Sequence, residues 1–228
     1  DKLNIDELKS KYVLLAHSSG VDSCVLANIF FQNKINFSVA HCNFQLRGQE
    51  SELDLKFLKN WCAEYNIPFF YKLFETKTYM SVMKKGTQQA ARELRYNWFQ
   101  SLMDDKGFDV LVTAHHLNDQ FETFLINATR GTGISGLLGI PQTRKIIRPL
   151  TTVSKKDIIN YAKKYKIEWR EDSSNSTQDY LRNRLRHQVT EPLERINPDL
   201  IRNFKKTLEH LSEAEEFISN QLDKIKDK

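Results

Sequence analysis

One short run of small and polar residues carries the clearest chemical signal in the sequence: Ser18-Ser19-Gly20-Val21-Asp22-Ser23. An apolar run, Tyr12–Ala16, precedes it, and a second one, Cys24–Phe31, follows it. These runs predict a buried strand and a buried helix, so the six residues form the turn between them. Gly20 can adopt a positive φ at little cost, and free N–H groups at a helix N-terminus favour an anion. The run therefore predicts a phosphate-binding loop, to which three serine hydroxyls add donors.

Asp22 is the only acidic residue of this loop, and its carboxylate would repel a phosphate. Two interpretations remain open: Asp22 caps the helix, or it holds Mg²⁺ against the phosphates. No Gly-Lys-Ser/Thr follows, and the three-glycine spacing of dinucleotide-binding proteins is missing. The sequence therefore excludes a Walker loop and a dinucleotide fingerprint.

Two further groups of residues could do chemistry. Asp119 and Glu122 lie three apart on one face of an expected helix, and His115 precedes them as a general base or phosphate donor. Arg182 and Arg186 share the face of a later helix and suit a phosphate or a carboxylate. The alternatives that stay open are first-turn carboxylates favoured by the helix dipole, a structural role for His115, and a solvated basic face.

The elements that must position these residues alternate between strand and helix, which predicts βαβ units and a parallel sheet. The expected strands are Tyr12–His17, Phe37–Cys42, Phe69–Phe74, Asp109–Ala114 and Ile146–Leu150. The expected helices are Asp22–Gln32, Ser51–Tyr65, Gln88–Asp105, Asn118–Thr129, Ser154–Lys166, Tyr180–Leu193 and the chain from Pro198 onwards. Lys77–Lys85, the glycine-dense stretch Arg130–Pro141 and the polar stretch Glu171–Asp179 are expected to be irregular.

Polar residues gather where three of these strands end: His17, His41-Cys42-Asn43 and His115-His116. Parallel sheets bind ligands beyond the carboxyl ends of their strands. The fold class we predict is α/β, a parallel five-stranded sheet with helices on both faces, followed by a helical C-terminal extension. Its candidate site lies at this end of the sheet.

Composition places the chain among globular proteins with one sizeable domain and an appendage, because 228 residues are 40% hydrophobic and 28% charged. No apolar run approaches the ~20 residues of a membrane span, so no membrane partner is expected. Three scattered cysteines predict reduced thiols in a cytoplasmic protein, and the absence of a Cys-x-x-Cys pair argues against structural zinc. The net charge of +5 and several basic clusters suit either a solvated surface or a polyanion such as RNA.

The loop resembles the Ser-Gly-Gly-x-Asp-Ser loop of the PP-loop ATP pyrophosphatases, with Ser19 where those proteins have glycine. Further stretches are similar to motifs of the tRNA(Ile)-lysidine synthetases, in the same order and spacing over residues 12–200. They are His41–Gly48 (with Phe44 in place of a second His), His115–Thr123, Arg130–Gly133 followed by Gly136-Leu137, and Glu171–Asn175 with Tyr180–Arg186.

The resemblance implies a PP-loop fold and an ATP-dependent ligase. The reaction joins L-lysine to C2 of the wobble cytidine of an isoleucine tRNA with a CAU anticodon, through an adenylated tRNA, releasing AMP and pyrophosphate. It implies ATP binding by Ser18, Ser19, Gly20, Val21, Asp22 and Ser23, and catalysis by Asp22, His115, Asp119 and Glu122. It implies Mg²⁺ as a cofactor, with Asp22 as candidate ligand; Asp119 and Glu122 could hold the metal, hold lysine or take its proton. Candidate contacts to lysine or tRNA are Arg47, Arg130, Asp172, Asn175, Arg182 and Arg186.

Two other classes of function stay open: a PP-loop tRNA thiolase, which commonly needs catalytic cysteines, and a non-catalytic nucleotide- or RNA-binding module. We expect a PP-loop catalytic domain over residues 1–195 and a C-terminal helix over 196–228 that leads to further tRNA-gripping domains. The chain would then be a fragment, or the apolar seam of that helix would form a homodimer. The seam residues are Phe204, Leu208, Leu211, Ile218, Leu222 and Ile225.

Overall fold

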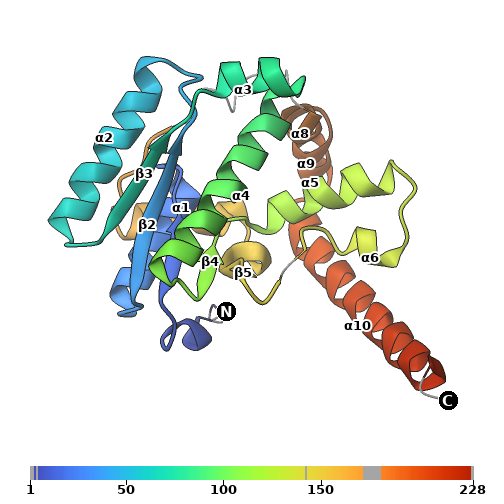
Figure 1. The fold of residues 1–228 in the computed structure, drawn as a ribbon. Helices are drawn as coiled ribbons and strands as arrows, with labels where there is room; N and C mark the ends of the chain where they lie inside the picture. Colours follow the sequence, from blue (N-terminus) through green and yellow to red (C-terminus); the bar gives the residue numbers. More distant parts are fainter. Residues whose placement is uncertain (1–2, 4, 142, 172–180, 227–228) are drawn as a thin grey trace. The chain divides into compact units, whose positions relative to one another are not determined.

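The computed structural model describes residue 3 and residues 5–141, 143–171 and 181–226 (Figure 1). The chain divides into two units, and each is described by itself. The sheet unit comprises residues 1–114, 143–149 and 158–171, and the helical unit comprises 115–142, 150–157 and 172–228. The predicted boundary between residues 195 and 196 stays a prediction.

Five parallel strands form the sheet within the described residues, in the order β3-β2-β1-β4-β5. Their bounds are β1 Val13–Ala16, β2 Phe37–Asn43, β3 Phe69–Leu73, β4 Val110–Val112 and β5 Ile146–Ile147. The predicted five-stranded parallel sheet is therefore confirmed. The last strand is shorter than expected, because Pro149 begins a 3₁₀ turn, Pro149–Thr152.

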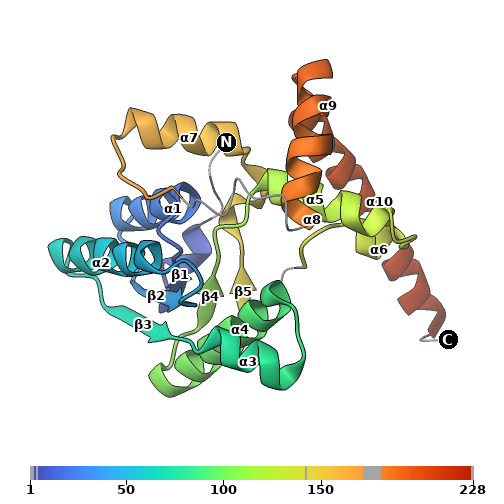
Figure 2. The same ribbon diagram turned by 90° about the horizontal axis from the view of Figure 1, so that it is seen from above.

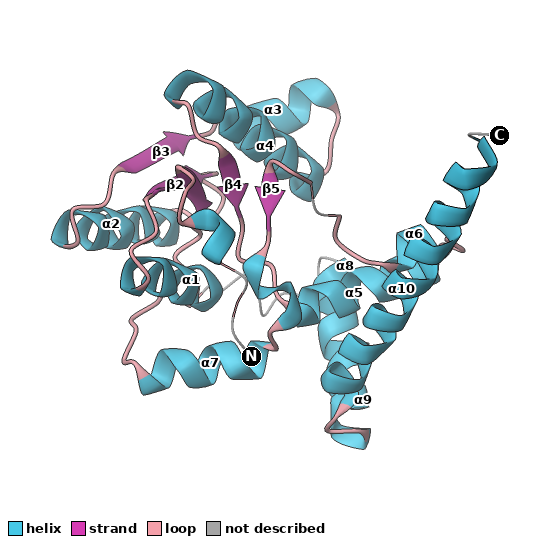
Figure 3. Cartoon of the chain, turned by 90° about the horizontal axis from the view of Figure 1, so that it is seen from below, coloured by secondary structure: helices cyan, strands magenta, loops and turns pink. Residues whose placement is uncertain are grey.

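Helices cover both faces of this sheet, as predicted (Figures 2 and 3). The helices α1 (Val21–Gln32) and α2 (Gln49–Glu64) lie on one face, and α4 (Thr87–Lys106) lies on the other. Leu14 and Leu111 project from neighbouring strands onto the α4 side, where they join Phe99 and Leu102 in one apolar cluster. The alternation of side chains along each strand thus supplies apolar residues to both faces.

The expectation that Lys77–Lys85 is irregular is wrong, because α3 spans Thr76–Met83. Lys84 ends this helix with φ 51°, a left-handed cap, and Tyr79 and Lys85 both bond Glu93 of α4. Contacts to the next helix therefore stabilise a segment whose own sequence gives little helical signal. Ser51 was expected to begin α2, but the helix begins two residues earlier, at Gln49, so Ser51 lies buried within its first turn.

The helical unit contains α5 (Leu117–Ala128), the short α6 (Ile134–Leu137) inside the glycine-dense stretch, and α10 (Leu200–Lys226). Phe121 of α5 and Phe204 of α10 form its core, with ring centroids 4.9 Å apart. We expected a single helix in the stretch of chain before α10. The structure has three shorter elements there: α8 (Leu181–Leu185), a π-helical turn (Arg186–Thr190) and α9 (Glu191–Ile196). Pro192 lies in the first turn of α9, where proline is tolerated, rather than ending a helix.

The remaining helix, α7, spans Lys155–Lys164, and the hydroxyl of Ser154 accepts a hydrogen bond from the N–H of Asp157, as a cap should. The last turns of α10 leave four large apolar residues exposed: Phe217, Ile218, Leu222 and Ile225. Homodimer formation through this helix stays a prediction. No helix in the described part of the chain has the length and apolarity needed to cross a membrane.

Candidate functional site

The loop between β1 and α1 is built around Ser19, which has φ 70° and is 2% exposed. A side chain in this left-handed region costs roughly 1–2 kcal/mol, whereas glycine adopts it freely. The sequence motif has glycine at this position, and the structure gives the physical reason. Ser19 therefore holds a conformation that other contacts must stabilise.

Those contacts engage every polar group of Ser19. Its N–H donates to Nδ1 of His17 at 3.1 Å, and its carbonyl accepts the N–H of Arg170 at 3.0 Å. The same carbonyl accepts the thiol of Cys24 at 3.3 Å, and the hydroxyl bonds the carbonyl of Ser18. Residues on three separate segments thus determine the shape of the loop.

The other loop residues surround the start of α1. Gly20 is the N-cap of α1 and has no side chain to cap the helix. The hydroxyl of Ser23 donates to the carbonyl of Gly20 at 2.9 Å and accepts the N–H of Ser18 at 3.3 Å. The interpretation of Asp22 as the helix cap is wrong, because Asp22 lies inside the first turn. Its carboxylate remains a candidate for Mg²⁺, which proteins often bind through one or two carboxylates plus substrate phosphates.

Two buried histidines support the loop from the strand ends. Nδ1–H of His41 donates to the carbonyl of His17 at 2.9 Å, and both side chains are 4% exposed. Burial, aided by the neighbouring His41, lowers the pKa of His17 to about 3, and burial also lowers the pKa of His41. Both rings are therefore neutral at physiological pH, so they position the loop and do not act as cations for phosphate.

A buried carboxylate lies beside the loop and holds two arginines. Asp54 of α2 accepts Nη2 of Arg47 on one oxygen and Nε of Arg170 on the other, each at 2.7 Å. Arg47 was expected to contact substrate, whereas Asp54 and Arg170 were not anticipated. The available signal was an acidic residue on the buried stripe of a helix, four residues before the buried Leu58.

In the helical unit, His116 and Asp119 cap the start of α5 reciprocally. The N–H of His116 donates to Oδ2 of Asp119 at 2.9 Å, and Nδ1 of His116 accepts the N–H of Asp119 at 3.3 Å. Burial acts to raise the pKa of Asp119, but His116, His115 and Arg186 together bring it below its ordinary value. Asp119 is thus a carboxylate at physiological pH, and it both caps the helix and faces a cluster of basic groups.

Glu122 is the most buried acid of this cluster. Its side chain is 1% exposed, and Oε1 accepts both Nε and Nη2 of Arg186 at 2.8 Å. The other oxygen, Oε2, has no hydrogen-bond partner within the described structure. Burial raises the pKa of Glu122, although Arg186 opposes this. A second donor, such as an ammonium, would satisfy Oε2.

The structure thus brings Asp119, Glu122 and Arg186 together, with Nη2 of Arg186 3.9 Å from Oδ1 of Asp119. Nη2 of Arg182 lies 3.4 Å from the hydroxyl of Thr123, one residue further along α5.

The other predicted substrate contacts lie elsewhere. Arg130 is exposed beyond the opposite end of α5. Asp172 and Asn175 lie outside the described residues. Within the part of the chain that the structure describes, no three His, Cys, Asp or Glu side chains are grouped to hold a metal ion.

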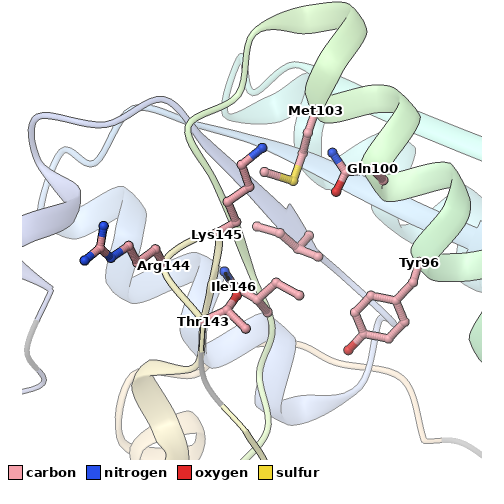
Figure 4. Close-up of a pocket in the computed structure, with 8 residues that line it drawn as sticks. Tyr96, Gln100, Met103, Thr143, Arg144, Lys145 and Ile146 are labelled. Atoms are coloured by element: carbon pink, nitrogen blue, oxygen red, sulfur yellow. Dashed lines mark hydrogen bonds between the residues drawn. The ribbon is translucent and has the colours of Figure 1, made fainter. Parts of the chain in front are cut away.

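A separate pocket of about 400 Å³ lies between α4 and β5 (Figure 4). Tyr96 and Met103 of α4 face Lys145 across it, while Arg144 points away. The residues before β5 mark the amino end of a parallel sheet, whereas the loop at Ser18–Ser23 follows the carboxyl end of β1. This pocket is therefore not part of the candidate site.

Comparison with known proteins decides the family. The PP-loop domain matches residues 2–193 of the chain. The chain belongs to the PP-loop domain family. This PP-loop protein is 36% identical over 215 residues to the tRNA(Ile)-lysidine synthase of Bacteroides thetaiotaomicron, covering 94% of the chain and 50% of the relative. It is 37% identical to that of Chlorobaculum tepidum, covering 93% of the chain and 66% of the relative. The chain spans about half to two thirds of the length of these relatives.

Solved structures agree on the fold. The U34-tRNA thiolase NcsA from Methanococcus maripaludis, with its [4Fe-4S] cluster, has a TM-score of 0.70 at 20% identity, over 91% of this chain and 76% of that one. NMN synthetase from Francisella tularensis has a TM-score of 0.53 at 12% identity, over 90% of this chain and 89% of that one. At this identity the likeness concerns the fold of the PP-loop protein alone.

Proposed function

We propose that this PP-loop protein is the catalytic part of a tRNA(Ile)-lysidine synthetase, a cytoplasmic ligase that uses ATP and Mg²⁺. In the proposed reaction, O2 of the wobble cytidine attacks the α-phosphate of ATP and pyrophosphate leaves. The amine of L-lysine then forms the new bond to C2, and AMP leaves with the former O2. The RNA substrate is an isoleucine tRNA with a CAU anticodon.

The observation that carries this proposal is the ion pair between the buried Glu122 and the partly exposed Arg186. An amine substrate that arrives with an ammonium and a carboxylate needs an acidic and a basic partner, and this pair offers both. The free oxygen of Glu122 suits the ammonium, and Arg186, 32% exposed, suits the carboxylate. The raised pKa of Glu122 also suits a group that exchanges a proton with an amine.

The loop Ser18–Ser23 would bind the phosphates of ATP. Ser18–Ser23 receives the pyrophosphate at the N-terminus of α1, where backbone N–H groups and the helix dipole favour anions. Asp22 would hold Mg²⁺, which neutralises phosphate charge when bound. Asp119 would hold the ammonium of lysine beside Glu122, and His115 would accept the proton that the amine loses when it attacks C2.

The cysteines favour this reaction over sulphur transfer. Burial raises the pKa of Cys42 and of Cys62 to about 12, and it raises that of Cys24 as well. The thiolate is the reactive form of cysteine, so none of the three is prepared for nucleophilic chemistry. A thiolase function of this chain is accordingly the weaker candidate.

The test is incorporation of labelled lysine into unmodified isoleucine tRNA with a CAU anticodon, in the presence of ATP and Mg²⁺. We expect label in the RNA, with one AMP and one pyrophosphate released per lysine. Glu122→Gln should abolish incorporation and leave ATP binding intact, whereas Gly20→Val should abolish ATP binding. Release of ADP, or a requirement for a sulphur donor in place of lysine, would refute the proposal.

A further inference from the structure

The end of α7 and the two residues after it form an exposed basic surface, which we call the α7 patch. It consists of Lys163, Lys164, Tyr165 and Lys166, all of them exposed. In the part of the chain that the structure describes, the ammonium groups of the three lysines pair with no carboxylate. Glu168, the next acid along the chain, is itself exposed and holds none of them. The patch therefore presents three cations to solvent.

An aromatic contact orients one of these cations. The rings of Tyr161 and Tyr165 lie 4.3 Å apart, and Nζ of Lys164 lies 5.3 Å from the centroid of the Tyr165 ring. An ammonium this close to a ring is attracted to its face without being neutralised. Tyr165 thus positions the charge of Lys164 at the surface and leaves it available to an anion.

The α7 patch lies close to the phosphate-binding loop. From the end of α7 the chain turns back beside α1 (Figure 2), and the N–H of Arg170 donates to the carbonyl of Ser19 at 3.0 Å. Four residues of chain span at most about 14 Å, so Lys166 lies within that distance of Arg170. Residues 158–171 and the loop belong to the same sheet unit. A few nucleotides of RNA can therefore reach from the loop to the patch.

The dipole of α7 offers a second explanation for the lysines. Lys163 and Lys164 lie in the last turn of the helix, where cations are favoured. Lys166, however, has φ 52°, a left-handed conformation in which glycine is preferred. The effects of the dipole and of the backbone thus act in opposite directions at Lys166, and a substitution there separates ligand binding from helix stability.

We propose that the α7 patch binds the phosphate backbone of the RNA substrate beside the reacting nucleotide. The inference rests on the proposed function, which supplies the RNA. Clustered lysines without acidic partners suit a polyanion, because each phosphate that they neutralise releases a bound counterion. Phosphate contacts fix the orientation of a nucleic acid without reading its sequence. The patch would hold the RNA in register while the loop binds ATP.

Lys166→Gly tests the proposal because RNA binding and helix stability predict different results. Glycine adopts the left-handed backbone without strain, so the urea midpoint of unfolding should be unchanged or higher. Loss of one phosphate contact should weaken binding of a synthetic anticodon stem-loop about fivefold at about 0.1 M salt, and should lower the log–log salt slope by about 0.7–0.9. The difference should vanish near about 1 M salt. The affinity for ATP, titrated separately, should not change.

Lys34→Gly is the matched control. Lys34 is also exposed, has φ 54° and follows α1 at the end away from the loop, beyond a helix of 12 residues that is about 18 Å long. The variant removes the same charge and relieves the same backbone conformation, so its stability should change in the same direction. Its affinity for the stem-loop should stay that of the wild type. An equal loss of RNA affinity in both variants would show an effect of net charge alone and would overturn the inference.

The triple variant Lys163→Gln, Lys164→Gln and Lys166→Gly extends the test to the whole patch. It should bind the stem-loop about a hundredfold more weakly at about 0.1 M salt, with a salt slope lower by about 2. Circular dichroism checks its fold, and if it does not fold, Lys166→Gly decides alone.

Two results overturn the inference: variants of the patch that bind the stem-loop as tightly as the wild type, or a wild type that binds no stem-loop even at low salt. In the first case the lysines serve the helix end or face solvent. A wild type whose RNA binding depends on the patch, but which incorporates no lysine into the tRNA, overturns the proposed function alone.

Discussion

Arg186→Gln should destabilise the helical unit in a way that depends on pH. The substitution removes two contacts of 2.8 Å to Oε1 of Glu122 and leaves a carboxylate that is 1% exposed without its cation. Breaking a buried ion pair costs about 3–5 kcal/mol when the remaining charge stays in place. Glu122 can avoid a buried charge by taking up a proton. The free energy of that protonation is therefore the largest loss of stability that the substitution can cause.

This largest loss follows from the ordinary pKa of the carboxyl, 4.5. At about 1.36 kcal/mol per pH unit, protonation costs about 3.4 kcal/mol at pH 7 and about 0.7 kcal/mol at pH 5. The pKa of Glu122 is already raised in the wild type, so stability falls as pH rises above the ordinary value. Arg186→Gln should steepen that fall, with a loss of up to about 3 kcal/mol at pH 7 and under about 1 kcal/mol at pH 5.

Urea denaturation of the wild type, Arg186→Gln, Glu122→Gln and the double variant at both pH values measures these differences. In the double variant position 122 no longer carries a buried charge, so most of the stability lost at pH 7 should return. The refuting result is a loss for Arg186→Gln that is equal at both pH values, or a double variant no more stable than Arg186→Gln. Either outcome would mean that Glu122 is not a buried charge that depends on Arg186.

Three further predictions concern the loop and the start of α5. Ser19→Gly should change the free energy of unfolding by less than about 1 kcal/mol. Glycine relieves the strain of the left-handed backbone, and this offsets the lost hydroxyl hydrogen bond and the greater entropy of the unfolded chain. The affinity for ATP should be equal or tighter, and a tenfold loss of affinity would contradict this prediction. His17, with a pKa of about 3, should contribute stability that is complete above about pH 6.5 and declines below it, by about 1.4 kcal/mol between pH 7.5 and pH 5.5. His17→Asn keeps an acceptor for Ser19 and should remove that part of the pH dependence in urea titrations. Asp119→Asn should cost under about 1 kcal/mol of stability, because the amide oxygen of asparagine can still accept the N–H of His116, while lysine incorporation falls at least tenfold. Equal losses in the two assays would assign Asp119 a capping role only.

The parallel sheet was predictable from sequence because each strand carries its own local signal. The run Tyr12–Ala16 is apolar and precedes a run of small residues, and Val110–Val112 is enclosed by polar neighbours in the same way. Burial on both faces leaves such strands nearly continuous in apolar residues. The mispredicted α3 depends instead on side-chain contacts to the next helix, where Glu93 accepts hydrogen bonds from Tyr79 and Lys85.

In the candidate site, too, the features with a local sequence signal were predictable and the contacts between distant residues were not. The spacing within short stretches predicts that Asp119 and Glu122 share one helix face and that Arg186 lies on the face of another helix. That Arg186 bonds Glu122 across 64 residues depends on packing, and no spacing rule contains it. Asp54 and Arg170 were missed for the same reason, because neither lies in a recognisable motif and their contact spans 116 residues.

The bonding of Ser19 has a consequence for protein engineering. Its N–H, carbonyl and hydroxyl are all engaged inside the protein, by His17, Arg170, Cys24 and Ser18. The six-residue loop is therefore not a transferable module: grafted onto another strand–helix turn, Ser18–Ser23 would lack the histidine before it and the arginine far after it. A serine in the left-handed region without those partners would relax, and the graft would lose its shape. A transplant of this loop should succeed only if residues equivalent to His17 and Arg170 are moved with it, or if the serine is exchanged for glycine.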